Sequence, residues 1–178
     1  MSKLQQKQEQ KQIPVDNANL IIPRLWLGNA KSSVDEDFIR HHNITVVFNC
    51  TKNLPFSPMI PIKYRVPVDD NLEEDEIRNM ELWSAEIAYK IMAEYTEGKT
   101  ILVHCAAGMQ RSAASVAFML IAYMRLRAQD AMIFIKERRP IAFYPKANFG
   151  RSIDYFDRRF HGEIMPEVKK LPQNNKMD

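Results

Sequence analysis

The stretch from His104 to Ser112 constrains the fold most strongly, because it joins two apolar segments of different periodicity. Residues 100–103 are a short β-branched run, which predicts a buried strand. After Arg111, apolar residues recur at helical spacing with no glycine or proline before Pro140, which predicts a long buried helix. The residues between the two segments therefore form a loop that leads from a strand into a helix N-terminus.

A loop of this kind can bind a phosphate-like anion through unpaired backbone N–H groups and the positive end of the helix dipole. Cysteines at such positions have pKa values of about 3.5–7.5 instead of about 8.5, so Cys105 is expected to be a thiolate. Arg111 can offer a planar fork to two oxygens. Gly108 allows a sharp backbone bend, and the Ser112 hydroxyl is placed to hydrogen-bond the sulfur. The expected phosphate-binding amides belong to Ala106, Ala107, Gly108, Met109, Gln110 and Arg111.

The alternative for Cys105 is an ordinary buried thiol, since free cysteine is among the most buried residue types. That alternative explains neither the glycine nor the arginine at these offsets from the cysteine. We therefore favour a reactive cysteine.

Composition sets broad limits on the chain. Its 178 residues, 46% hydrophobic and 26% charged, predict one globular domain. The net charge of +3 is too small to indicate nucleic-acid binding. Two cysteines do not make a disulfide framework and fit a reducing compartment, which predicts a cytoplasmic protein, with the nucleus as the second interpretation.

Several kinds of segment and site are not expected. The polar N-terminus does not resemble a signal peptide, and no apolar window is long enough for membrane insertion. The spacing of His41, His42 and His161 does not predict a metal site, and we expect no metal and no cofactor.

The order of elements predicts an α/β fold: a single domain with a central, mostly parallel sheet flanked by helices. We expect a polar, flexible arm over residues 1–19, a catalytic domain over 20–162 and a polar tail over 163–178. A helix in the arm that docks on a second subunit, giving a dimer, is the second interpretation of residues 1–19. Strands are predicted around 20–22, 25–27, 45–50, 62–68 and 100–103, and helices around 33–41, 71–97, 111–126, 130–138 and after Pro145.

If the anion bound by this loop is a phosphate ester, its cleavage also needs an acid that protonates the leaving oxygen. Asp69 and Asp70 follow the 62–68 strand, so they can face the same sheet edge as Cys105. The alternative for this acidic segment is that it only caps the next helix, with Asp69 or Asn71 as the N-cap residue. Asn71 with Glu74 three residues later would then form a capping box that opens this helix.

The motif HCxxGxxR followed by Ser resembles the signature of cysteine-dependent protein phosphatases, here His104 to Ser112. The resemblance to dual-specificity phosphatases covers roughly residues 20–160. The segment Leu25–Ala30 is similar to their LYLGN-type opening, residues 47–51 to their VLNVT-like strand, and Pro145 with Phe149 to their PNxxF element. Lys146 departs from the asparagine expected there, and Ala128 from a capping serine or threonine.

The resemblance implies hydrolysis of phosphotyrosine and phosphoserine or phosphothreonine in phosphorylated proteins through a phosphocysteine intermediate. Cys105 would be the nucleophile, Arg111 and the loop amides would hold the phosphoryl oxygens, and Ser112 would assist the departing sulfur. The family's acid usually stands three residues after a proline that ends the strand, so Pro67 indicates Asp70 over Asp69. His104 would be a supporting neighbour of the thiolate.

Other phosphatase classes fit the loop less well. Phosphoinositide phosphatases place lysines inside it, whereas its variable side chains here are uncharged, and RNA 5′-triphosphatases favour His and Asn within it. A phosphoprotein-binding pseudophosphatase usually lacks the cysteine, the arginine or the acid, and this chain has all three.

The position of Cys50 in the sequence resembles that of a second cysteine in phosphatases of regenerating liver. In those enzymes the second cysteine forms a reversible disulfide with the nucleophilic cysteine. This resemblance makes Cys50 a candidate redox partner of Cys105. A small buried hydrophobic residue is an equal alternative for Cys50.

Overall fold

A computed structural model describes residues 15–169 of the chain. The predicted arm therefore lies mostly outside the described residues, as does the end of the predicted tail. A five-stranded sheet has the order β1-β2-β5-β3-β4 and forms the centre of the molecule. Its strands are β1 (Ala18–Ile22), β2 (Leu25–Gly28), β3 (Val46–Asn49), β4 (Ile62–Arg65) and β5 (Ile101–His104). Only β1 runs antiparallel to its neighbour, so the predicted mostly parallel α/β sheet is confirmed.

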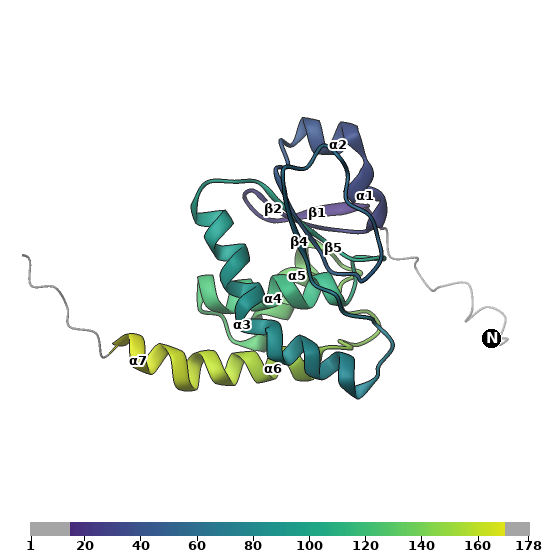
Figure 1. Ribbon diagram of the computed structural model, residues 1–178. Helices are drawn as coiled ribbons and strands as arrows, with labels where there is room; N and C mark the ends of the chain where they lie inside the picture. The colour runs from purple at the N-terminus through teal and green to yellow at the C-terminus, as the bar shows by residue number, and fades with distance from the viewer. Residues whose placement is uncertain (1–14, 170–178) are drawn as a thin grey trace, which may run out of the picture.

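Helices cover both faces of this sheet (Figure 1). Two short helices, α1 (Ala30–Val34) and α2 (Glu36–His41), lie on one face. The larger layer on the other face contains α3 (Glu74–Thr96), α4 (Arg111–Met124), α5 (Ala128–Arg138) and α6 (Gly150–Arg159). A π-helical turn, η1 (Phe160–Ile164), and α7 (Met165–Lys169) continue α6.

The alternation of side chains along β5 explains why the sheet needs both layers. Ile101 and Val103 point into the large core under α3 and α4, while Leu102 belongs to a smaller cluster with Ile39 of α2. All four residues of β5 are buried, as expected for the central strand of a parallel sheet. Both faces of the strand that carries the signature loop are therefore fixed by packing.

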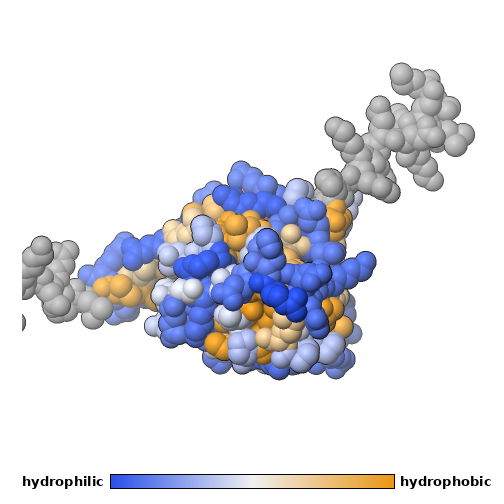
Figure 2. Space-filling model, turned by 90° about the horizontal axis from the view of Figure 1, so that it is seen from above, coloured by the Kyte–Doolittle hydropathy of each residue, from blue (hydrophilic) through white to orange (hydrophobic). Residues whose placement is uncertain are grey.

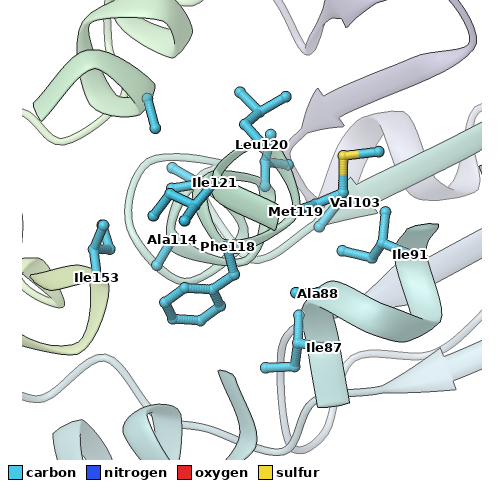
Figure 3. Packing of buried hydrophobic residues seen from close by; sticks show 14 of the residues in the cluster. Ile87, Ala88, Ile91, Val103, Ala114, Phe118, Met119, Leu120, Ile121 and Ile153 are labelled. Atoms are coloured by element: carbon cyan, nitrogen blue, oxygen red, sulfur yellow. The ribbon is translucent and has the colours of Figure 1, made fainter. Parts of the chain in front are cut away.

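Helix α4 is surrounded by apolar neighbours. Every residue from Ser112 to Ile121 is buried. Figure 3 shows its side chains between Ile87 and Ile91 of α3, Val103 of β5 and Ile153 of α6. A helix that is apolar all round belongs in a core, and here that core holds the start of α4 beneath the signature loop.

The long helix is confirmed, but its predicted start is wrong. Of the apolar side expected from the sequence, Met80, Ser84, Ile87, Ile91 and Tyr95 are buried, whereas Ile77, near the start, is half-buried. The expected capping box does not form, because α3 begins at Glu74 after an N-cap, Glu73, whose side chain makes no capping hydrogen bond. The Asn71 side chain instead accepts a hydrogen bond from the Glu73 N–H (3.0 Å) within the preceding turn.

The predicted helix over residues 33–41 is two helices. Asn29 caps α1 through a bond from the Ser32 N–H (3.1 Å), and Asp35 caps α2 through a bond from the Phe38 N–H (3.0 Å). Two caps in close succession end one helix and start the next.

The last helical layer continues past Gly162, where the sequence indicates a polar tail. Residues 163–169 remain helical, since Met165 is buried and Ile164 packs on the core. A sparse apolar pattern is therefore enough to dock this segment.

The face seen from the α1 and α2 side is mostly hydrophilic, with separate apolar spots between charged side chains (Figure 2). Within residues 15–169 no helix combines the length and the apolarity needed to cross a bilayer.

We predict that Phe118→Ala lowers the free energy of unfolding by about 3–5 kcal/mol, because it leaves a cavity in the core around α4. The Phe118 side chain is 0% exposed. Urea unfolding followed by circular dichroism measures the change. The control is Tyr89→Ala in α3, where the side chain is 75% exposed and a change within about 0.5 kcal/mol is expected. Equal losses in the two variants would contradict the assigned core.

Candidate active site

The signature loop leaves the carboxyl end of β5 and enters the N-terminus of α4, as the sequence predicts. Ala106 and Ala107 are exposed at its mouth, while Cys105 is almost fully buried at its base. Gly108 has a φ of +67°. A Cβ atom there would collide with the Gly28 carbonyl and the Arg139 guanidinium, so only glycine fits.

Arg139 is a buried arginine that holds two carbonyl groups of this loop. Its Nε donates to the Gly108 carbonyl oxygen (2.7 Å) and its Nη2 to that of Ala107 (3.2 Å). Its Nη1 donates to the carbonyl oxygen of Asp16 (2.8 Å) and to Oδ1 of Asn19 (2.7 Å). The guanidinium therefore draws the loop carbonyls to the outside and ties them to the chain before β1.

Two more loop carbonyls are held from outside by main-chain donors. The Ala30 N–H donates to Ala106 O (3.0 Å) and the Phe143 N–H donates to Met109 O (2.8 Å). With four successive carbonyls turned outward, the loop N–H groups are free to converge on an anion above Cys105.

The Cys105 sulfur lies in the field of these donors. Its Sγ lies 3.1 Å from the Ser112 hydroxyl oxygen. Burial raises the pKa of Cys105, but the Ser112 hydroxyl, the Ser112 and Gly108 N–H groups and the Arg111 charge outweigh burial, so the pKa is lowered. A lowered pKa favours the thiolate, which is the nucleophilic form of cysteine.

Arg111 starts α4 and reaches across to the loop after β4. Its Nη1 donates to the Val68 carbonyl oxygen (3.1 Å), and its buried Nε has no hydrogen-bond partner within residues 15–169. An unpaired, buried guanidinium N–H beside the cradle is suited to a phosphoryl oxygen. A surface hollow next to the loop is lined by Thr51, Lys52, Asn53, Leu54, Asp69, Ala106 and Arg111.

The two acid candidates have different surroundings. Asp69 lines this hollow, and its Oδ2 lies 3.1 Å from Nζ of Lys52. Its N–H donates to Oε2 of Glu76 (3.0 Å). Asp70 is exposed, and its Oδ1 accepts a hydrogen bond from Nδ2 of Asn148 (2.9 Å). One carboxylate is thus ion-paired, and the other contacts a neutral amide.

His104 is a buried, neutral neighbour of Cys105. Burial lowers its pKa to about 4, and its Nδ1 lies 3.2 Å from the Cys105 carbonyl oxygen. Its buried Nε2 has no hydrogen-bond partner in the described part of the chain.

Cys50 lies one residue beyond β3, next to the base of the loop. Its N–H donates to the His104 carbonyl oxygen (2.8 Å), and its sulfur lies 3.4 Å from the Ser115 hydroxyl oxygen. Burial raises the pKa of Cys50 to about 12. The two cysteines are therefore both buried near the start of α4, but the pKa is raised for Cys50 and lowered for Cys105.

The sequence does not reveal the contacts of three side chains in this arrangement. Arg139 and Asn148 act on the loops from positions far along the chain, and Gln110 contributes its side chain as well as its amide. In the sequence Arg139 is simply an arginine directly after the predicted 130–138 helix, and this position does not indicate its contacts with the loop. No group of three or more His, Cys, Asp or Glu side chains suited to a metal ion occurs among residues 15–169.

Comparisons with known proteins agree with the geometry of the site. Residues 25–159 match the family described as dual specificity phosphatase, catalytic domain. The chain is similar to Tyrosine-protein phosphatase vhp-1 of Caenorhabditis elegans, with 32% identity over 145 residues, which are 79% of this chain and 21% of the relative. It is 30% identical to human Dual specificity protein phosphatase 8 over 148 residues, 80% of this chain and 23% of the relative. The chain thus spans about a fifth of the length of these curated relatives.

Solved structures include similar folds. The crystal structure of human DUSP28 superposes with a TM-score of 0.69 at 26% identity, covering 84% of this chain and 97% of that one.

We predict that Ser112→Ala shifts the pKa of Cys105 upward, because the hydroxyl is the largest contribution opposing burial. The pH dependence of Cys105 alkylation by iodoacetamide, followed by peptide mapping, measures the pKa. The alkylation curve should move to higher pH in the variant, since the thiolate then forms only at higher pH. Ser84→Ala, another buried serine whose hydroxyl bonds its own helix backbone, is the control and should not move the curve. An unshifted curve in Ser112→Ala would show that the hydroxyl does not stabilise the thiolate.

Proposed function

Because this chain belongs to the dual-specificity phosphatase family, we propose that it is an active protein phosphatase for phosphotyrosine and for phosphoserine or phosphothreonine. The observation that carries the proposal is the Cys105 sulfur held by the Ser112 hydroxyl and by loop N–H groups at the start of α4. An anion site with a thiolate at its base can both bind a phosphoryl group and attack it.

In the first step the Cys105 thiolate attacks phosphorus in line, forming the S–P bond as the P–O bond to the substrate breaks. Asp70 donates a proton to the departing oxygen. Arg111 and the loop amides hold the remaining phosphoryl oxygens, on which negative charge is concentrated.

In the second step water attacks the phosphocysteine and Asp70, now a carboxylate, takes its proton. The S–P bond breaks, phosphate leaves, and the Ser112 hydroxyl, 3.1 Å from the sulfur, stabilises the returning thiolate. Asp70 is preferred over Asp69 because it can exchange a proton without breaking an ion pair, whereas Asp69 is paired with Lys52.

The surroundings of the loop support phosphorylated proteins as substrates. The variable loop side chains are uncharged, which does not suit the several phosphates of an inositol lipid. We propose that the protein acts in the cytoplasm or nucleus, which two free thiols support. Dimer formation through the N-terminal arm remains a prediction, because that segment lies outside the described residues.

Two substitutions test the catalytic assignment. Cys105→Ser should abolish hydrolysis of p-nitrophenyl phosphate and of phosphopeptides, a loss on the order of 10⁴-fold or more, since removing a nucleophile disables the whole mechanism. Asp70→Asn should lower kcat on phosphopeptides about 10²-fold or more, the usual contribution of a general acid. The control is Lys146→Ala, which removes an exposed side chain and retains the main-chain carbonyl that Gln110 contacts. If Cys105→Ser retained activity, the chain would not be a cysteine-dependent phosphatase.

We further propose that Cys50 protects Cys105 from irreversible oxidation. Peroxide would oxidise the Cys105 thiolate to a sulfenic acid, and the Cys50 sulfur would displace water from it, forming a disulfide. Support comes from the bond between the Cys50 N–H and the His104 carbonyl, which places Cys50 beside the start of the loop.

Peroxide treatment tests this protective role of Cys50. Non-reducing peptide mapping should find a Cys50–Cys105 linkage, and thiol should restore activity. In Cys50→Ala, activity should be lost irreversibly at the same peroxide dose. Absence of the linkage, or equal recovery of both proteins, would contradict the proposal and leave Cys50 as a packing residue.

A further inference from the structure

The segment between α5 and α6 is attached to the signature loop by a buried side chain. Gln110 is 5% exposed, and its Nε2 donates to the carbonyl oxygens of Tyr144 (3.2 Å) and Lys146 (2.9 Å). Its Oε1 accepts a hydrogen bond from the Asn148 N–H (2.9 Å). Three hydrogen bonds from one amide therefore fix the main chain of residues 144–148 relative to the loop that holds Cys105.

The same segment contacts the loop that carries the acid candidates. Nδ2 of Asn148 donates to Oδ1 of Asp70 (2.9 Å), and the Asn148 backbone is the part that Gln110 holds. Asn148 is half-buried, whereas Asp70 is exposed. An exposed carboxylate without such a contact would sample several rotamers, so this bond restricts where the carboxyl group lies.

The loop after β4 is also attached to the signature loop on its other side. Nη1 of Arg111 donates to the carbonyl oxygen of Val68 (3.1 Å), two residues before Asp70. The main chain at Val68 is thus bonded directly to Arg111, and the side chain of Asp70 is attached to Gln110 through Asn148. Gln110 and Arg111 are consecutive residues of the signature loop.

We propose that Gln110 and Asn148 form a positioning relay that sets the Asp70 carboxyl group relative to Cys105 for proton transfer to the leaving oxygen. This inference rests on the proposed phosphatase function. The side chains of Gln110 and Asn148 bond only residues of the 144–148 segment and Asp70 within residues 15–169, so both side chains act through Asp70.

Substrates with different leaving groups separate proton transfer from phosphate binding. Phenyl phosphate releases a poor leaving group that needs an acid, whereas 2,4-dinitrophenyl phosphate releases a phenolate that leaves without one. The readout is the ratio of kcat/KM for phenyl phosphate to kcat/KM for 2,4-dinitrophenyl phosphate. General damage to the phosphate-binding loop lowers kcat/KM for both substrates by the same factor, so it leaves the ratio unchanged.

Asn148→Ala should lower this ratio about three- to tenfold, a fraction of the 10²–10⁴-fold that a complete general acid supplies. Gln110→Ala should lower the ratio similarly, and the two substitutions together should lower it no further. In an Asp70→Asn background, Asn148→Ala should have no effect on the ratio, since the group on which it acts is already gone.

The matched control is Lys146→Ala, in the same segment. Its side chain makes no hydrogen bond or ion pair within the described residues, and its carbonyl, which Gln110 contacts, is retained. This variant should keep the wild-type ratio, and the thermal unfolding midpoints of Lys146→Ala and Asn148→Ala should match that of the wild type.

The outcomes separate the relay from the proposed function. A wild-type ratio in Asn148→Ala, or an additive loss in the Asp70→Asn background, overturns the relay. A ratio that falls in Asp69→Asn and stays unchanged in Asp70→Asn also overturns it, while leaving the phosphatase assignment intact. Activity retained in Cys105→Ser overturns the proposed function itself.

Discussion

The buried guanidinium of Arg139 is the interaction on which the candidate site depends most. It is fully buried and contacts four neutral oxygens, two of them carbonyls of the signature loop. Burial lowers its pKa, and the charge of Cys105 acts in the opposite direction, so the two opposite charges stabilise each other. A peptide unit whose carbonyl is turned outward directs its N–H inward. Because Arg139 holds the carbonyls of Ala107 and Gly108, the N–H groups of the loop are free to face an anion. The guanidinium also adds positive charge next to this anion site.

The two cysteines show how much this arrangement changes a thiol. Both are buried near the start of α4, and for both burial raises the pKa. For Cys50 burial dominates, and one hydroxyl contact with Ser115 leaves the pKa at about 12. For Cys105 the N–H groups of the loop, the Ser112 hydroxyl and the Arg111 charge outweigh burial. The difference in pKa between the two thiols therefore comes from oriented donors, with burial common to both.

The parts of the fold that depend on short-range patterns could be predicted from the sequence, and the parts that depend on distant contacts could not. The strand before Cys105, the buried helix after Arg111 and the inward stripe of α3 follow from apolar periodicity. The capping box does not form because Asn71 bonds within its own turn. The predicted 33–41 helix is divided because the Asp35 side chain caps a second helix, and a periodicity of apolar residues does not show which of several polar residues acts as a cap. The brace formed by Gln110 joins positions more than thirty residues apart, and no local pattern indicates it.

Binding a phosphoryl group and hydrolysing its ester need different parts of this site. The inward N–H groups, Arg111 and Arg139 would serve a phosphoprotein-binding module as well as an enzyme, because they only recognise charge and shape. The Ser112 hydroxyl beside the sulfur adds nothing to anion binding. The Asp70 carboxylate, attached through Asn148 to the segment that Gln110 holds, opposes anion binding by repulsion. A chain selected for binding alone would gain by losing that carboxylate. Here Asp70 is retained, and it is also attached by Asn148 to a segment that Gln110 fixes to the cradle. That a repulsive group is held in place, at a cost to binding, is the strongest structural argument that the site performs chemistry.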